Sequence, residues 1–282
     1  MSKRHRGERK PYTRVYIEIT NICNMSCSFC PGHKRAPRAM SEREFLKVLD
    51  SVAPFTDYVY LHLMGEPLTH PKILDFIALA RGKGFKPMIT TNGTRLAAMG
   101  EALAASGLYK VNISLHSFEK NDENKQKQYL TECCDFADKA SKNGTLVTYR
   151  LWNGGAGVDN DLTLDYLHTR YGEWVENRSG YKLSERVYLD FAQRFGWPDR
   201  EGELLGSDVY CYGLYDHFGI LSDGTVVPCC LDKDGEIALG NIFDTELKDI
   251  LDSPRARAIT EGFRNRNAPE ELCRRCPYAR RF

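Results

Sequence analysis

The residues best suited to chemistry are cysteines. Ten occur among 282 residues, mostly grouped at 23–30, 211–230 and 273–276, and such grouping favours metal ligation over disulfides. Cys23, Cys27 and Cys30 form a C-x3-C-x2-C loop directly after a short apolar strand. Three thiolates on one loop can face a single point, but a structural zinc site has four ligands. Iron–sulfur clusters are also normally held by four cysteines. The loop predicts a [4Fe–4S] cluster with one open iron; a zinc loop is the alternative.

The spacing of this loop, with Phe29 just before its last cysteine, resembles the signature of the radical S-adenosylmethionine (SAM) superfamily. The resemblance implies that the amino and carboxylate groups of SAM chelate the open iron. It further implies that one electron splits SAM to methionine and a 5′-deoxyadenosyl radical, which abstracts hydrogen from a substrate. A flavodoxin- or ferredoxin-type protein would supply the electron, in a reducing cytoplasm.

The segment 64–67, Met-Gly-Glu-Pro, resembles the Gly-Gly-Glu-Pro element that binds the SAM amino group, with methionine in place of the first glycine. An ammonium needs acceptors, which a carboxylate and exposed carbonyls provide. The simpler alternatives are a plain turn for the Gly-Glu-Pro segment, ordinary strand-end polar groups for Ser114 and Arg150, and core packing for Phe29. The resemblance implies SAM contacts at Phe29, Gly65, Glu66, Asn92, Ser114 and Arg150, and His116 and Arg150 are the catalytic candidates.

A second cysteine set follows the pattern C-x12-G-x4-C, then C-x2-C. Between its first two cysteines, residues 218–227 predict a hairpin around Asp223-Gly224. The pattern resembles the shortened SPASM, or twitch, extension of radical SAM enzymes, which holds one auxiliary [4Fe–4S] cluster. Four thiolates also suit zinc. The implied ligands are Cys211, Cys229, Cys273 and Cys276. Cys230 is expected to be a buried small hydrophobic residue, with substitution as a ligand the alternative, and Cys133 and Cys134 are expected to be structural.

Alternating strand-like and helix-like segments must position these residues. The patterns predict strands at 15–20, 57–63, 85–91, 109–116, 145–152 and 186–191, and helices from 41, at 71–82, 96–106, 122–143, 162–175 and 246–251. Such an order favours right-handed βαβ units whose ligands gather at the carboxyl ends of parallel strands, where the candidate residues fall. We therefore expect an α/β fold: a partial (β/α)6 barrel with a small C-terminal hairpin and helix extension.

Composition limits the partners. The formal net charge of +1 provides no field for nucleic acid, and no run approaches the ~18 apolar residues of a membrane span. The basic first ten residues lack the apolar core of a secretory signal. We expect a basic disordered tail over 1–13, the barrel over 14–207 and the extension over 208–282, with no recognised motif in 154–207.

The substrate is expected to be a small molecule, because only 22 residues precede Cys23 and peptide-modifying members often carry a leader-binding region there. The layout, including the run Arg-Leu-Trp-Asn at 150–153, resembles queuine lyase, which would imply a deazapurine read by Asp216. A peptide- or protein-modifying maturase and a non-catalytic zinc-binding α/β module are the alternatives. The candidate substrate contacts are His62, His116, Trp152, Asn153, Tyr210, Tyr212, Asp216 and His217.

Overall fold

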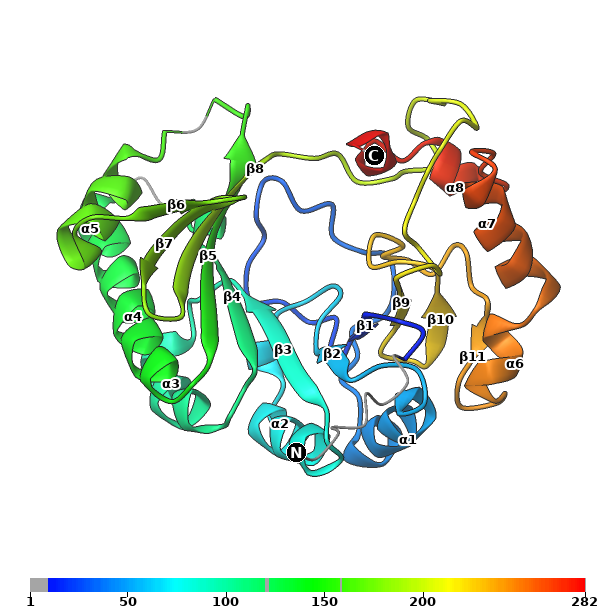
Figure 1. The fold of residues 1–282 in the computed structure, drawn as a ribbon, viewed down its shortest axis with the longest axis horizontal. Coiled ribbons are helices and arrows are strands. Elements are labelled where there is room, and N and C mark those ends of the chain that lie inside the picture. Colours follow the sequence, from blue (N-terminus) through cyan, green and yellow to red (C-terminus); the bar gives the residue numbers. More distant parts are fainter. Residues whose placement is uncertain (1–9, 120–121, 158, 282) are drawn as a thin grey trace, which may run out of the picture.

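The computed structural model describes residues 10–119, 122–157 and 159–281. Within them, one curved 11-stranded sheet has the order β11-β10-β9-β1-β2-β3-β4-β5-β8-β7-β6 (Figure 1). The strands are β1 (Arg14–Ile17), β2 (Tyr58–Tyr60), β3 (Lys86–Thr91), β4 (Lys110–Ser114), β5 (Leu146–Gly154), β6 (Val175–Asn177), β7 (Gly180–Ser184), β8 (Val187–Gln193), β9 (His217–Ile220), β10 (Thr225–Val227) and β11 (Gly240–Asn241).

The six neighbours β1, β2, β3, β4, β5 and β8 all pair in parallel, which confirms the predicted partial barrel. Helices cover its outer face (Figure 1), and the first begins at the predicted capping box of Ser41 and Glu44. These helices are α1 (Glu42–Val52), α2 (Ile73–Gly82), α3 (Leu96–Ala105), α4 (Glu123–Lys142) and α5 (Asp161–Tyr171), with short 3₁₀ turns at Pro67–Thr69 and Leu115–Ser117.

Alternation along the strands separates the core from the site. In β1, Val15 and Ile17 are fully buried in the hydrophobic core, whereas Tyr16 points to the opposite face, because successive side chains of a strand alternate. The inner face of the barrel therefore carries the polar and aromatic side chains that are free for binding.

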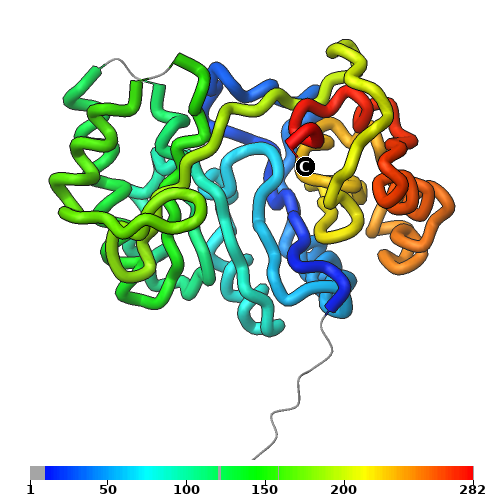
Figure 2. Tube along the Cα trace, turned by 45° about the horizontal axis from the view of Figure 1, so that its top comes forward, coloured from blue at the N-terminus to red at the C-terminus, as the bar shows by residue number. Residues whose placement is uncertain are grey.

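The C-terminal region continues the barrel sheet. Strand β9 pairs in parallel with β1, and β10 and β11 follow antiparallel, so the predicted hairpin forms on the first barrel strand. Helices α6 (Leu247–Leu251), α7 (Pro254–Arg264) and α8 (Glu271–Arg274) and a 3₁₀ turn at Tyr278–Arg281 complete it. The chain between β8 and β9 crosses the open side of the barrel (Figures 1 and 2).

Two features differ from the sequence expectations. The antiparallel strands β6 and β7 extend the sheet beyond β8, in the stretch without a recognised motif. Residues 10–13, which we expected to belong to the tail, are instead hydrogen-bonded to the rest of the protein. Tyr12 N–H donates to Phe55 O and Thr13 N–H donates to Asp216 O, both at 3.0 Å. The rest of the predicted tail, 1–9, lies outside the described residues. No described helix has the length and apolar character to cross a membrane.

Candidate active site

The loop after β1 carries the three N-terminal cysteines. Asn24 joins it to the end of β3, donating to Thr94 Oγ1 (2.9 Å) and accepting from Asn92 Nδ2 (3.0 Å). Burial raises the pKa of Cys27 to about 11, the Ser117 side chain opposes this rise, and the Glu119 carboxylate and the neighbouring thiols add to it. The Cys27 thiol donates to Ser117 O at 3.8 Å. A cluster would be held by the thiolate forms of these cysteines, each of which would release its proton on binding iron.

The described residues contain no group of three or more His, Cys, Asp or Glu side chains placed to share a single metal ion. A [4Fe–4S] cluster does not need such a group, because each iron takes a different cysteine. The donor set of three thiols therefore fits a cluster with one iron free of protein.

The turn after β2 packs directly on the cluster loop. Gly65 has φ +75°, and a Cβ there would lie 2.6 Å from Thr20 O. Glu66 is buried, and its carboxylate accepts from Thr91 Oγ1 and Asn92 N, both at 2.7 Å. Burial raises its pKa to about 7 against these hydrogen bonds. Glu66 thus ties the ends of β2 and β3 together; its contact with the SAM ammonium stays a prediction.

A cavity of about 670 Å³ lies between the inner face of the barrel and the C-terminal extension. It brings together most of the residues predicted from the sequence. These lining residues are Phe29, His62, Ser114, His116, Arg150, Trp152, Cys211, Tyr212, Asp216, His217, Cys229, Cys273 and Cys276.

Two of the predicted substrate contacts lie outside this lining, as do the predicted SAM contacts Gly65, Glu66 and Asn92 and the cluster cysteines Cys23, Cys27 and Cys30. Asn153 is buried, and its side chain exchanges hydrogen bonds with that of Asn160 at 2.9 and 3.2 Å. These hydrogen bonds close the loop after β5, and the substrate contact expected of Asn153 stays a prediction. Tyr210 is also absent from the described lining and packs edge-on against Tyr212.

Arg150 is the main cation on the barrel side of the cavity. Its guanidinium stacks 4.2 Å from the Trp152 ring centroid and donates to Thr90 Oγ1 at 3.4 Å. Its buried Nε has no hydrogen-bond partner among the described residues. A guanidinium with unused donors suits a bidentate carboxylate, which agrees with the predicted contact to the SAM carboxylate.

Two histidines present complementary atoms to the cavity. His62 Nδ1 accepts from Thr90 N–H at 3.1 Å, so the neutral ring carries its proton on Nε2. His116 Nδ1 lies 3.0 Å from Arg150 O and 3.4 Å from Trp152 N. In the tautomer that makes the shorter bond, Nδ1 donates to the carbonyl and Nε2 is an acceptor; burial lowers the pKa of the ring. The pair can therefore donate to and accept from one polar ligand.

The stability of the fold should fall in acid because of His62. Burial and the charge of Arg150 lower its pKa to about 3, whereas the unfolded chain binds the proton below about 6.5. If no water reached the imidazole ring, the free energy of unfolding would fall by about 2 kcal/mol at pH 5. Because water reaches the cavity, we expect a loss of about 1 kcal/mol. The Tm should therefore fall between pH 7 and pH 5 by roughly 2–4 °C less in the His62→Gln variant than in the unsubstituted protein. An equal fall in both proteins would contradict this assignment.

The four C-terminal cysteines form the opposite wall of the cavity. A Cβ on Gly213 would lie 3.7 Å from Cys211 Sγ and 3.6 Å from Cys229 Cβ. Burial, and then the nearby Cys211 and Cys276 thiols, raise the pKa of Cys273 well above its usual value. A converging set of four thiols fits the second iron–sulfur cluster.

Cys230 differs from the buried structural role expected of it. It lines the cavity, and its thiol interacts with the Tyr16 hydroxyl. Cys133 and Cys134 are fully buried in the hydrophobic core, as expected.

Arg14, Tyr16 and Tyr60 are among the cavity residues that the sequence analysis missed. The two tyrosine rings stack with centroids 5.0 Å apart. The signal was present as alternation, because Arg14 and Tyr16 share one face of β1, opposite the apolar Val15 and Ile17.

Comparison with known proteins agrees with this geometry. The radical SAM superfamily profile matches residues 17–161, over half of the chain, and an iron–sulfur cluster-binding domain, SPASM, matches 211–277. A probable GTP 3′,8-cyclase of Methanocella arvoryzae is 32% identical over 276 residues, 83% of this chain and 87% of the relative.

Two solved structures share the fold. BtrN in complex with AdoMet and 2-DOIA has a TM-score of 0.60 at 17% identity, covering 95% of this chain and 94% of that chain. Native anSMEcpe with bound AdoMet and the Cp18Cys peptide has a TM-score of 0.62 at 13% identity, covering 94% and 88%. The chain belongs to the radical SAM superfamily, with a SAM-binding [4Fe–4S] cluster and, in its SPASM domain, an additional iron–sulfur cluster.

Proposed function

We propose that this radical SAM enzyme abstracts hydrogen from a small molecule held in the cavity between Arg150 and the SPASM cysteines. The observation that carries the proposal is the cavity itself, whose volume of about 670 Å³ is that of a small-molecule site. It joins three of the predicted SAM contacts, Phe29, Ser114 and Arg150, to the C-terminal cysteines. The SAM-binding cluster supplies the electron that generates the adenosyl radical, and a flavodoxin- or ferredoxin-type protein would reduce it.

The residues of the chain bind and orient the reactants. Arg150 and Ser114 would hold the SAM carboxylate, and Phe29, whose ring lies 5.0 Å from that of His116, would pack by the adenine. His62 Nε2–H and His116 Nε2 would bind polar atoms of the substrate. The aromatic walls around them exclude water, which protects a radical from quenching.

The names of the similar proteins bear on the substrate. The relative that aligns over most of its length is called a probable GTP 3′,8-cyclase, which supports a small molecule. The two solved structures contain a small molecule, 2-DOIA, in one case and the Cp18Cys peptide in the other, and they do not favour either class. A deazapurine finds less support, because Asp216, expected to read its N–H edge, already accepts from Thr13 Oγ1 (2.6 Å) and from Arg14 (3.0 Å).

The test is an anaerobic assay of the reconstituted enzyme with SAM and dithionite. A metabolite fraction or a peptide fraction is added, and mass spectrometry follows 5′-deoxyadenosine and new products. We expect the metabolite fraction to raise the yield of 5′-deoxyadenosine. Stimulation by the peptide fraction alone would contradict the proposal and favour a peptide-modifying maturase.

Replacing Arg150 by glutamine should weaken SAM binding. A charge-assisted hydrogen bond contributes about 1.5–3 kcal/mol, so we expect the KM for SAM to rise roughly tenfold to a hundredfold. Arg150→Lys keeps the positive charge but loses the paired N–H donors of the guanidinium. Its KM for SAM should lie between those of the unsubstituted enzyme and Arg150→Gln. The control is Arg170→Gln, since that arginine pairs with Asp135 and Asp138 on the helical surface. A raised KM for the substrate alone would reassign Arg150 to the substrate.

A further inference from the structure

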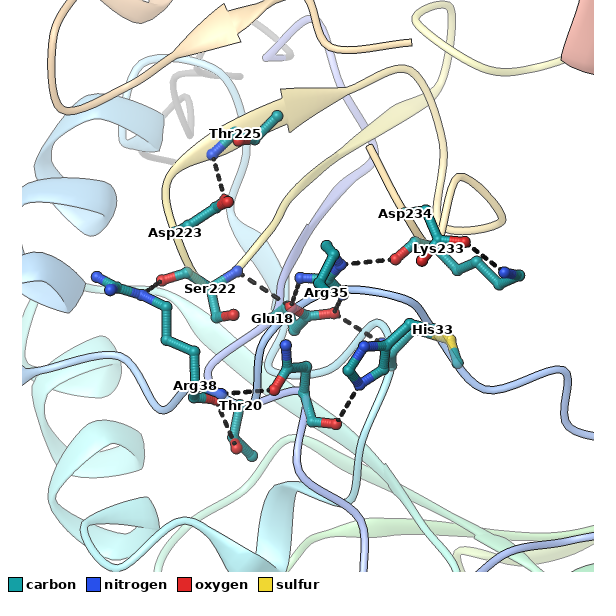
Figure 3. Close-up of polar contacts among 12 residues, drawn as sticks. Glu18, Thr20, His33, Arg35, Arg38, Ser222, Asp223, Thr225, Lys233 and Asp234 are labelled. Atoms are coloured by element: carbon teal, nitrogen blue, oxygen red, sulfur yellow. Dashed lines mark hydrogen bonds and ion pairs between the residues drawn. The ribbon is translucent and has the colours of Figure 1, made fainter. Parts of the chain in front are cut away.

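Glu18 is a fully buried carboxylate that joins three separate segments (Figure 3). Its two oxygens accept from Arg35 Nη1 and Nη2, both at 2.6 Å. They also accept from the backbone N–H groups of Met64 (3.2 Å) and Ser222 (3.1 Å). One side chain thus receives hydrogen bonds from the chain after the cluster loop, from the end of β2 and from the β9–β10 turn.

The environment of this ion pair distinguishes it from a surface salt bridge. The Glu18 side chain is 0% exposed and that of Arg35 is 14% exposed. Burying a carboxylate is costly unless its charge is paired and its lone pairs are hydrogen-bonded. Here both conditions are met, and the fork geometry of Arg35 fixes the direction of the carboxylate.

Each segment that reaches Glu18 belongs to a different part of the active site. Met64 directly precedes Gly65 of the predicted SAM-binding turn. Arg35 lies five residues after Cys30, the last of the three cluster cysteines, on the same loop. Ser222 lies in the hairpin that leads to Cys229. Displacing the carboxylate would therefore move the SAM turn and the SPASM hairpin relative to each other.

The segment around Arg35 also holds the SPASM region directly (Figure 3). Arg35 Nε donates to Lys233 O at 2.8 Å, and Lys34 N–H donates to Asp234 Oδ1 at 2.6 Å. Arg38 Nε donates to Ser222 O at 2.8 Å. The chain that leaves the cluster loop is thus clamped between β1 and the hairpin region.

We propose that Glu18 and Arg35 form a positioning pair that holds the SAM turn and the cluster loop in register with the SPASM hairpin. Neither residue is among the described residues that line the cavity; both act through the backbone that they hold. The inference depends on membership of the radical SAM superfamily and not on the identity of the substrate.

The test is Glu18→Gln, which keeps the size of the side chain but leaves the buried Arg35 without its counter-charge. Hydrogen–deuterium exchange should accelerate at least tenfold in the peptides that contain Met64 and Ser222, with or without clusters. In the reconstituted enzyme, the KM for SAM should rise tenfold or more. The matched control is Glu42→Gln, which breaks the exposed Lys72–Glu42 pair (2.9 Å) and should change neither quantity.

Arg35→Lys is a milder second variant, because it retains the charge and loses the bidentate fork. We expect a smaller change of the same kind, and this variant decides the matter if Glu18→Gln does not fold. A lower Tm with an unchanged KM for SAM and exchange accelerated evenly over the chain would overturn the proposal and leave a purely structural pair. If the small-molecule proposal alone fails, these readouts do not change.

Discussion

Replacing Cys27 by alanine is expected to abolish the reductive cleavage of SAM. Cys27 is the central thiol of the three-cysteine loop, and its Sγ lies 3.8 Å from Ser117 O, on the side of the loop that faces the end of β4. Without it, only two thiolates remain, too few to hold a cluster with one open iron. Anaerobically reconstituted protein should lose one cluster's share of iron and form no 5′-deoxyadenosine.

Two further cysteine variants make this result specific. Cys134→Ala removes a thiol that is buried in the core and should leave SAM cleavage intact. Cys273→Ala should keep SAM cleavage while it destabilises the C-terminal region or alters the product, because that thiol belongs to the SPASM set. SAM cleavage retained in Cys27→Ala would refute the assignment of the cluster.

Much of the barrel could be predicted because the sequence signals for its elements each lie within a few neighbouring residues. The capping box at Ser41, the turn at Asp223-Gly224 and the alternation in β1 are each read within a few residues. The cysteine spacings are equally local, and the four cysteines of the C-terminal set line the cavity. The chemistry of the site therefore followed from short motifs placed at strand ends.

What escaped prediction depends on contacts between distant residues. The parallel pairing of β9 with β1 joins Val15 to Phe218, and nothing in either segment specifies the other. Glu18 and Arg35 read in the sequence as ordinary charges, and only the fold shows that one is fully buried. Cys230 likewise faces the cavity because β9 and β10 pair with the barrel.

Replacing Gly65 by alanine should disable SAM cleavage without removing a single polar group. Its φ of +75° costs an L-residue about 1–2 kcal/mol. In addition, the new Cβ would lie 2.6 Å from Thr20 O and 2.7 Å from the carbonyl carbon of Asn21, both backbone atoms next to the cluster loop. The SAM turn and that loop must therefore separate, and we expect a tenfold or larger loss in kcat/KM for SAM.

Gly84→Ala separates the two effects. Gly84 has a similar φ of +85°, but nothing lies within 4 Å of its built Cβ, so this variant carries the conformational cost without the collision. We expect it to be destabilised by about 1 kcal/mol and to cleave SAM normally. Comparable SAM cleavage in both variants would show that close packing of the turn against the cluster loop is not needed for activity, whereas a loss confined to Gly65→Ala would assign that requirement to the contact with Thr20.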